Sequence, residues 1–307
     1  MAQNNTVTIA TFNCEFLTRP KVHVKFGLPF NIGKATAEER QEWNQPGFRD
    51  QKFNEAAKEV AKVITMVNAD VIALTEVGDE TDVAELQNEI RDLGLDYPHR
   101  AVGRSRDTFT RQHVGILSKF LLNDIVVEIP GREIYVEEPD DPEREDDTGI
   151  SKGMRVSFVA FGREFLLYVV HLASEAGGYD QDQQRIAQAS ILRRHYLREI
   201  KEGELVIVAG DLNDRRGQPA VRRIRGLDDI HEDLIQTGHK GYFDDRLDTR
   251  WTYEFEGIRE QIDHILLSFS VKNACKRSGI SARTIDHENE LASDHRPLVV
   301  TLKLKDE

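Results

Sequence analysis

Apolar residues recur along the chain with two periods, one typical of helices and one typical of strands. Between residues 53 and 67 they return every three or four positions, which predicts a helix with one face toward the core. Further helices are expected at 81–93, where Gly94 is a stop signal, and at 180–200. Short apolar runs predict strands at 7–12, 70–75, 114–118, 121–128, 154–161, 165–170, 205–209, 262–268 and 298–304.

The order of these elements predicts the fold class. The strands at 154–161 and 165–170 are separated only by Gly162-Arg163-Glu164, which indicates a hairpin, whereas other strands are joined through helices. Hairpins mixed with helical crossovers imply mixed sheets, and apolar strands on both sides of a core imply two sheets face to face with helices outside. No internal repeat or linker interrupts the pattern, so residues 1–307 are expected to form one domain.

Two segments fall outside this pattern. Residues 18–48 are rich in Pro, Gly and charge and look irregular, and a loop of that length is usually functional or mobile. Residues 137–147 hold much of the acidity of the chain, which predicts a solvated or disordered loop. A calcium site is the alternative for the acidic segment, but the ligand spacing of an EF-hand loop is absent.

The most informative polar residues follow the apolar run 206–209. Gly210 is followed by Asp211 and Asn213, which alternate along the chain and so face the same side of an extended segment. A carboxylate and an amide on one side of a strand end suit a hydrated divalent cation, or a phosphate held beside one. Gly-Asp-x-Asn is also a common way to leave a strand through a turn, so this segment alone leaves both interpretations open.

Five other segments place acidic, amide or imidazole side chains where apolar runs begin or end. These residues are Asn13, Glu15, Glu76, His171, Asp263, Asp294 and His295. In layered α/β proteins, strand ends and their loops are where ligands bind. We therefore expect these side chains to join Asp211 and Asn213 in one assembled site.

Composition narrows the class of protein. The chain of 307 residues is 39% hydrophobic and 31% charged, as in soluble globular proteins, and no apolar run approaches the roughly 20 residues of a membrane span. A formal net charge of −13 argues against tight non-specific binding to nucleic acid, but it does not exclude a nucleic-acid substrate. Two cysteines provide neither a disulfide framework nor a zinc set, and residues 1–5 show no secretion signal. We expect a cytoplasmic protein without a membrane or an obligate protein partner.

Seven short motifs follow one another along the chain. They are Phe12-Asn13-Cys14-Glu15, Leu74-Thr75-Glu76-Val77, Val114-Gly115-Ile116-Leu117-Ser118, Val170-His171-Leu172, Gly210-Asp211-Leu212-Asn213, Ile262-Asp263-His264-Ile265-Leu266 and Ser293-Asp294-His295-Arg296-Pro297. In this order the chain resembles the endonuclease/exonuclease/phosphatase superfamily, which includes the DNase I-like nucleases. The resemblance implies a four-layer α/β sandwich, with two mixed β-sheets face to face and helices outside, and metal-dependent phosphoester hydrolysis. Thr75 stands where the family often has Gln, and residues 18–48 and 137–147 match no family segment, so substrate choice stays open.

Phosphoester hydrolysis needs an activated water, charge stabilisation on the phosphoryl oxygens and help for the leaving oxygen. Glu76 is the first candidate for a metal ligand, and the resemblance adds Asp294 and Glu15 to the metal site. Hard oxygen ligands suit Mg²⁺ or Mn²⁺, with Ca²⁺ as an alternative. Asp211 and Asn213 would face the water and the phosphate or hold a second metal ion, so the number of ions stays open.

His295, oriented by Asp263, is the candidate general base. A carboxylate fixes the tautomer of a histidine and stabilises its charged form, and a histidine accepts protons near neutral pH. His171 would contact the phosphate or assist the leaving group. Asn13 would orient Glu76 or a phosphate oxygen.

Other polar residues have less specific assignments. Ser174 is a further candidate phosphate contact, and His264, inside an apolar strand, is interpreted as structural. Arg104, Arg106 and Arg111 either grip substrate phosphates or belong to an ordinary solvated loop.

The leading hypothesis is a metal-dependent endonuclease or phosphodiesterase whose substrate is a phosphoester, with nucleic acid as one option. One alternative is a phosphomonoesterase acting on a small phosphorylated molecule, which the negative net charge mildly favours. Another is a non-catalytic binding protein that kept the fold, although the full set of polar residues counts against it. A lipid phosphodiesterase is a further alternative, but the sequence shows no evident exposed apolar hairpin.

Overall fold

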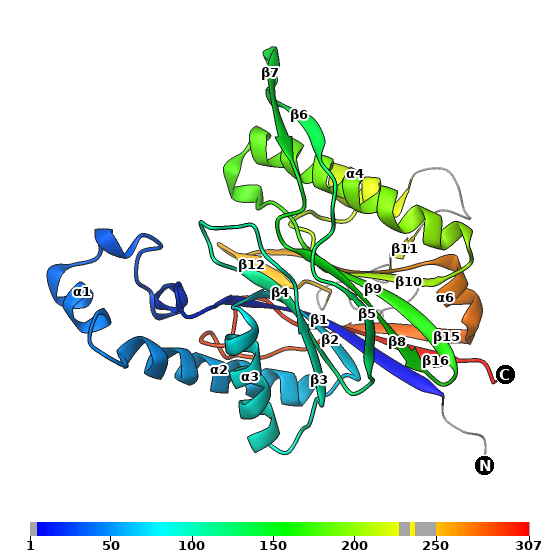
Figure 1. Ribbon diagram of the computed structural model, residues 1–307, viewed down its shortest axis with the longest axis horizontal. Coiled ribbons are helices and arrows are strands. Elements are labelled where there is room, and N and C mark those ends of the chain that lie inside the picture. Colours follow the sequence, from blue (N-terminus) through cyan, green and yellow to red (C-terminus); the bar gives the residue numbers. More distant parts are fainter. Residues whose placement is uncertain (1–4, 227–233, 237–249, 307) are drawn as a thin grey trace.

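Two six-stranded β-sheets packed face to face form the centre of the molecule (Figure 1). The computed structural model describes residues 5–226, 234–236 and 250–306. A buried apolar cluster joins the facing sides of the two sheets and includes Ile9 from one sheet and Ile207 from the other. The prediction of mixed sheets packed face to face is therefore confirmed, because the apolar sides of both sheets bury each other.

The first sheet has a parallel pair at its centre. In spatial order its strands are β15 (Cys275–Thr284), β16 (Leu298–Leu304), β1 (Thr6–Leu17), β2 (Val71–Val77), β4 (His113–Ser118) and β3 (His99–Val102). Strands β1 and β2 are parallel, and β16 and β4 pair antiparallel on either side of them. Strand β16 therefore begins at the edge where β1 and β2 end.

The second sheet repeats this arrangement. Its order is β11 (Ile235–Gln236), β14 (Asp263–Leu267), β10 (Leu205–Asp211), β9 (Arg163–His171), β8 (Gly153–Ala160) and β5 (Leu122–Val126). Strands β9 and β10 are parallel, and β14 and β8 flank them antiparallel. The turn between β8 and β9 is shorter than expected, because Arg163 already pairs with Ala160.

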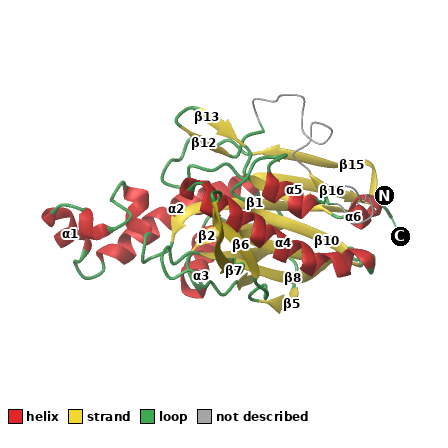
Figure 2. Ribbon diagram, turned by 90° about the horizontal axis from the view of Figure 1, so that it is seen from above, coloured by secondary structure: helices red, strands yellow, loops and turns green. Residues whose placement is uncertain are grey.

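Helices cover the outer face of each sheet and complete four layers. The main helices are α2 (Phe48–Val67) and α3 (Glu80–Asp92) on the first sheet, and α4 (Tyr179–Lys201) and α5 (Pro219–Arg225) on the second (Figure 2). The three helices predicted from periodicity are confirmed, each beginning slightly earlier than expected. The side chain of Asp79 caps α3 by accepting from two backbone N–H groups. A short helix, α6 (Phe269–Ala274), joins β14 to β15.

Residues 18–48 are more regular than the sequence indicated. They contain two 3₁₀ helices, η1 (Val22–Phe26) and η2 (Ile32–Lys34), and the helix α1 (Ala37–Trp43). Thr36 and Glu39 form a capping box at the start of α1. The buried Trp43 ring packs against the rings of His23, Phe26 and Phe48. The expectation of an irregular segment is wrong because a local aromatic cluster, which has no periodic pattern, holds it together.

The acidic segment is a β-hairpin whose residues 138–141 and 143–147 are exposed, so the expectation of a solvated segment is confirmed, whereas the expectation of a loop or a disordered segment is wrong. Its strands are β6 (Glu133–Glu138) and β7 (Asp141–Thr148), which rise beside α4 away from the sheets (Figure 1). Arg144 pairs with Glu137 and Glu138, and Arg132 pairs with Asp147. These cross-strand ion pairs offset the repulsion that the acidic composition suggested.

Two further observations bear on the sequence predictions. In the described part of the chain, no helix combines the length and the apolar character needed to cross a membrane. Most of the N-terminal segment that shows no secretion signal lies outside the described residues. The single domain over residues 1–307 stays a prediction.

Candidate active site

The register of the strands brings the polar strand ends together. In the first sheet, Asn13 of β1 lies beside the end of β2, which carries Glu76. In the second sheet, Asp211 of β10 pairs with His171 of β9 and with Asp263 of β14. The Nδ2 atom of Asn13 donates to Oδ2 of Asp211 over 2.8 Å, which joins the two sheets at this edge.

The backbone at these strand ends is strained. Four non-glycine residues have a positive φ there, namely Glu15 (42°), Phe16 (49°), Glu76 (58°) and Asn213 (49°). Such conformations cost on the order of 1–3 kcal/mol each and persist only where the surrounding contacts fix them. The pairing of β1 with β2 also shifts its register beyond Asn13. The irregular backbone therefore sits where the candidate site residues gather, a common feature of functional sites.

One group of side chains, which we call the carboxylate cluster, consists of Glu76, His171 and Asp211. The Nε2 atom of His171 lies 3.7 Å from Oε1 of Glu76 and 3.9 Å from Oδ2 of Asp211. Asn13 bridges the two carboxylates, since its Nδ2 also donates to Oε1 of Glu76 over 3.2 Å. The backbone N–H of Asn213 donates to Oδ1 of Asp211 over 2.8 Å, which fixes the orientation of that carboxylate.

The second group is the Asp263–His295 pair. Nδ1 of His295 lies 2.7 Å from Oδ2 of Asp263, and both side chains are buried. The ring of Tyr253 packs against His295 with 4.7 Å between ring centroids. The hydroxyl of Thr252 accepts from the backbone N–H of Asp263 over 3.1 Å. These contacts hold the imidazole in one orientation, with Nε2 left for a proton on the other side.

The site carries more negative charge than its own cations offset. Burial raises the pKa of Asp211 to about 7, and repulsion from Asp263 adds to the effect. Burial alone would lower the pKa of His295, but attraction from Asp263, Asp294 and Asp211 outweighs it and raises this pKa to about 10. Burial lowers the pKa of His171, and nearby positive charge lowers it further. Burial together with carboxylate repulsion therefore favours the protonated form of Asp211, and carboxylate attraction favours the protonated form of His295.

The residues present fit a hard divalent cation. Ligand atoms of Glu76, His171 and Asp211 all lie within 4.8 Å of one another, and so do ligand atoms of Asp211, Asp263 and His295. Nδ1 of His171 and Oδ1 of Asp263 are buried without a hydrogen-bond partner. The carboxylate oxygens of Glu76 and Asp211 are hard ligand atoms of the kind that Mg²⁺ and Mn²⁺ prefer. Positive charge bound beside them would lower the pKa of His295, because it competes with the imidazolium for the same carboxylates.

Glu15 and Asp294 lie in the pocket wall and belong to neither of these ligand groups. Glu15 Oε2 is 3.4 Å from Nζ of Lys25. The buried Lys25 ammonium also donates to the backbone carbonyls of Cys14 (3.1 Å), Glu15 (2.8 Å) and Ala292 (3.0 Å). Asp294 is partly exposed, with Oδ1 3.8 Å from Nε2 of His295. The geometry therefore places Glu76 and Asp211 better than Glu15 or Asp294 to bind a cation.

The two groups share a pocket of about 470 Å³. Ser174 lines it, whereas Arg104, Arg106 and Arg111 do not. His264 is buried away from it and its Nε2 lies 2.9 Å from the Asp214 carbonyl oxygen, which agrees with a structural role.

An apolar hairpin forms one wall of the pocket, contrary to the sequence expectation. Its strands are β12 (Tyr253–Phe255) and β13 (Ile258–Glu260). Phe255 and Ile258 line the pocket and are 59% and 61% exposed. The expectation failed because each strand has only three residues, too few for a visible alternation of polar and apolar positions.

Sequence reasoning missed three side chains around these groups. Gln112 donates to the Glu76 carboxylate, Lys25 holds the strand end at Glu15, and Tyr253 packs on His295. Only Gln112 left a signal, as a polar residue directly before the apolar strand predicted at 114–118. The other two lie in segments without periodic patterning.

Comparisons with known proteins agree with this geometry. A family model described as the Endonuclease/Exonuclease/phosphatase family matches residues 10–295. No curated protein sequence matches the chain. Among solved structures, truncated TDP2 from Caenorhabditis elegans is 15% identical with a TM-score of 0.59, over 97% of this chain and 98% of that chain.

Two bacterial proteins of known structure also resemble this chain over nearly its whole length at low sequence identity. Beta toxin from Staphylococcus aureus is 14% identical with a TM-score of 0.61, over 96% of this chain and 99% of that chain. A mutant of that toxin has been solved with bound magnesium ions. An endonuclease/exonuclease/phosphatase family protein from Bacteroides thetaiotaomicron is 15% identical with a TM-score of 0.55, over 99% of this chain and 100% of that chain. These structures share the fold, and the family model spans the whole site; the chain belongs to the endonuclease/exonuclease/phosphatase family.

Proposed function

We propose that this protein hydrolyses phosphodiesters with the help of a divalent cation, as a phosphodiesterase or endonuclease. One observation carries the proposal: the carboxylate cluster and the Asp263–His295 pair meet at Asp211 and open into one pocket. Crowded carboxylates can hold a cation, and a carboxylate-oriented histidine can transfer a proton. Phosphodiester hydrolysis needs the bound cation and the proton transfer at the same phosphorus atom.

The carboxylates of Glu76 and Asp211 would hold the cation, which when bound would neutralise charge on the phosphoryl oxygens. Asn13 keeps the two carboxylates at a fixed separation through its shared amide. Asp294 is partly exposed and belongs to neither ligand group, and its Oδ1 lies 3.8 Å from Nε2 of His295, so it would act on that imidazole.

Two histidines lie beside these carboxylates. Because Nδ1 of His295 is engaged by Asp263, Nε2 is the nitrogen that exchanges a proton with water or substrate. His171 is buried and neutral, and its Nε2 sits between Glu76 and Asp211, where it can contact a phosphoryl or leaving oxygen. Asn213 holds Asp211 in place and bonds the Leu172 carbonyl next to His171, which ties the two strand ends together.

Hydrolysis of model esters tests the proposal. Bis-p-nitrophenyl phosphate should be hydrolysed with Mg²⁺ or Mn²⁺ and not with EDTA, and faster than mono-p-nitrophenyl phosphate. Glu76→Gln and His295→Ala should lose this activity, while His195→Ala, a histidine on α4 outside the pocket, should keep it. Faster hydrolysis of the monoester would indicate a phosphomonoesterase. Binding of the cation without hydrolysis of either ester would indicate a protein that kept only the fold.

A further inference from the structure

A row of aromatic rings leads out of the catalytic pocket. Phe16 lines the pocket at the end of β1. Its ring centroid is 5.9 Å from that of Phe30, and Phe30 is 4.7 Å from Phe109 with the ring planes 40° apart. The three rings come from three separate segments of the chain. Phe30 belongs to the segment 18–48 for which the family resemblance provides no counterpart.

The outer end of this row is open to solvent and carries a cation. Phe109 is 73% exposed, the largest exposed fraction of any large apolar side chain in the described residues. The Lys21 ammonium lies 3.7 Å from the Phe30 ring centroid and 5.7 Å from that of Phe109. An ammonium beside aromatic faces can attract both an anionic phosphate and the rings themselves. The row therefore combines three flat apolar rings with the positive charge of Lys21.

Hydrogen bonds fix the backbone of the loop that carries the exposed Phe109 ring. The backbone N–H of Phe109 donates to Oδ1 of Asp107 over 2.9 Å, and the hydroxyl of Thr18 donates to the Arg111 carbonyl over 3.2 Å. The same loop carries Gln112, whose amide donates to Glu76. An exposed aromatic ring on a loop bonded to the site is arranged before any ligand arrives, so little ordering cost would remain on binding.

We propose that the row of Phe16, Phe30 and Phe109 with Lys21 binds unpaired bases of single-stranded nucleic acid that leaves the catalytic pocket. This inference rests on the proposed phosphodiesterase function and names its substrate class. Bases stack on aromatic side chains whatever their sequence, and a nearby cation follows the phosphate backbone. Lys21 supplies that charge locally in a chain whose net charge is −13.

The position of Lys21 favours nucleic acid over a lipid surface. Its ammonium lies over the ring of Phe30 rather than at the border of an apolar patch. Burying the rings in hydrocarbon would take this ammonium and the nearby Asp107 carboxylate out of water, which is costly for charged groups. Stacked bases, by contrast, leave the cation beside phosphate and solvent.

Binding of a fluorescein-labelled single-stranded thymidine oligonucleotide tests the inference. It is measured by fluorescence anisotropy with Mg²⁺ in the His295→Ala background, which suppresses cleavage. Phe109→Ala should raise the Kd by about 5-fold or more, the loss expected for one stacked base. Lys21→Met should raise the Kd and reduce its dependence on salt. Phe161→Ala, an exposed phenylalanine in the turn between β8 and β9, is the matched control and should leave the Kd unchanged.

Kinetics in the otherwise wild-type protein separate this inference from the function on which it rests. Phe109→Ala should raise KM for the oligonucleotide and leave hydrolysis of bis-p-nitrophenyl phosphate unchanged. If the small diester is hydrolysed but Phe109→Ala and Phe161→Ala behave alike on the oligonucleotide, the inference is overturned and the phosphodiesterase proposal stands. Phe109-dependent binding to phosphatidylcholine vesicles without oligonucleotide binding would overturn it in favour of lipid. If the small diester is not hydrolysed at all, the proposed function itself fails.

Discussion

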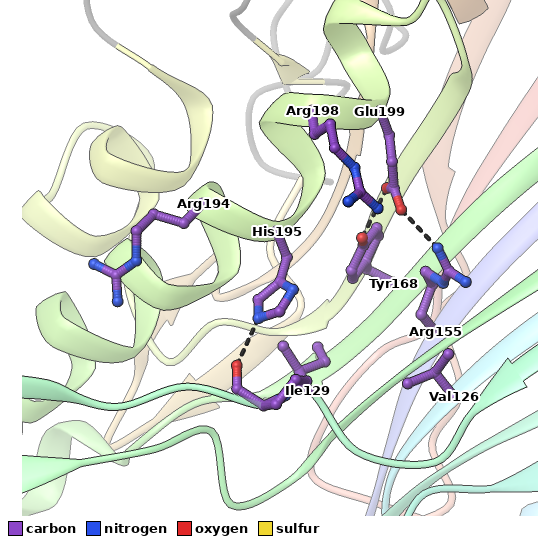
Figure 3. A pocket seen from close by; sticks show the side chains of 9 residues that line it. Val126, Ile129, Arg155, Tyr168, Arg194, His195, Arg198 and Glu199 are labelled. Carbon is purple, nitrogen blue, oxygen red and sulfur yellow. Dashed lines mark hydrogen bonds and ion pairs between the residues drawn. The ribbon is translucent and has the colours of Figure 1, made fainter.

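The pocket of the candidate active site and a second cavity beside α4 are both lined by glutamate, tyrosine and histidine, but they differ in how their charges are compensated. The second cavity has a volume of about 320 Å³, and its lining includes Arg155, Tyr168, His195 and Glu199 (Figure 3). There the Glu199 carboxylate accepts from Arg155 over 2.6 Å and from the Tyr168 hydroxyl over 2.7 Å. His195 Nε2 contacts the Pro130 carbonyl oxygen at 2.5 Å. The buried carboxylate and the histidine both have partners.

In the pocket of the candidate active site the carboxylates lie close to one another instead. Glu76 and Asp211 share the amide of Asn13. Burial, together with repulsion from Asp263, raises the pKa of Asp211 to about 7. Among the described residues, no arginine lines this pocket. The comparison teaches that buried charge with partners maintains the fold, whereas buried charge without them is available for a ligand.

The largest expected effect is a difference in kcat/KM between variants of His295 and of His195. Removing the imidazole in His295→Ala, or the carboxylate that orients it in Asp263→Asn, should lower kcat/KM for a phosphodiester by on the order of 10³-fold. His195→Ala should leave kcat/KM close to the wild-type value, because His195 lines the α4 cavity and its Nε2 contacts the Pro130 carbonyl oxygen. Steady-state kinetics on bis-p-nitrophenyl phosphate measure all three. Equal losses in His195→Ala and His295→Ala would remove the distinction between the cavities.

The second effect concerns stability at the α4 cavity. Glu199→Ala leaves Arg155 and the buried Tyr168 hydroxyl without their shared partner, so the free energy of unfolding should fall by about 3 kcal/mol. Urea unfolding measures this change. Glu202→Ala is the control, since Glu202 is exposed and 3.9 Å from Arg198, and it should change stability by about 0.5 kcal/mol or less. A Glu199 variant as stable as the control would show that this pair does not hold the fold together.

The third effect is a gain in stability, in contrast to the loss expected for Glu199→Ala. The pKa of Asp211 is raised to about 7 in the folded state, whereas its ordinary pKa, expected in the unfolded chain, is 3.8. As pH rises from 3.8 toward 7, the unfolded chain ionises this group more readily than the folded protein does, so the metal-free protein loses stability. Asp211→Asn cannot ionise, so it should be more stable than wild type by on the order of 2 kcal/mol above pH 7, although inactive. The difference should shrink toward pH 4. Thermal unfolding with EDTA across this pH range measures it, and a variant less stable than wild type at every pH would contradict the account of crowded carboxylates.

The smallest effect is stabilisation by the cation. At ten times its Kd, Mg²⁺ should raise the free energy of unfolding of wild type by about 1.4 kcal/mol, because it binds only the folded site. Glu76→Gln should lose most of this gain, whereas Glu199→Gln should keep it. Differential scanning fluorimetry with and without Mg²⁺ compares the three proteins. A gain retained in full by Glu76→Gln would mean that the cation binds elsewhere.

The strand-end residues could be predicted because their placement depends on local pattern. The apolar runs before Glu76, His171 and Asp211 predict strands, and strands in a layered α/β fold end at a common edge. The structure brings these residues and Asp263 and His295 together, as the sequence indicated. Their individual roles in catalysis stay proposals.

The remaining contacts depend on long-range packing that no periodicity encodes. Lys25 reaches the carbonyl of Ala292 across 267 positions of the chain, and its segment folds around the Trp43 cluster. The acidic hairpin forms because Arg132 and Arg144 face carboxylates across two strands, a register that composition alone does not reveal. Segments held by such pairs look irregular in sequence and ordered in the structure.

The location of a bound metal tests the central claim most directly. Crystals of the protein soaked in Mn²⁺ would be measured at a wavelength where manganese scatters anomalously. We expect an anomalous peak within about 2.3 Å of a carboxylate oxygen of Glu76, on the side facing Asp211. A pocket without a peak at saturating Mn²⁺, or a peak only at surface carboxylates such as those of the β6–β7 hairpin, would contradict the account.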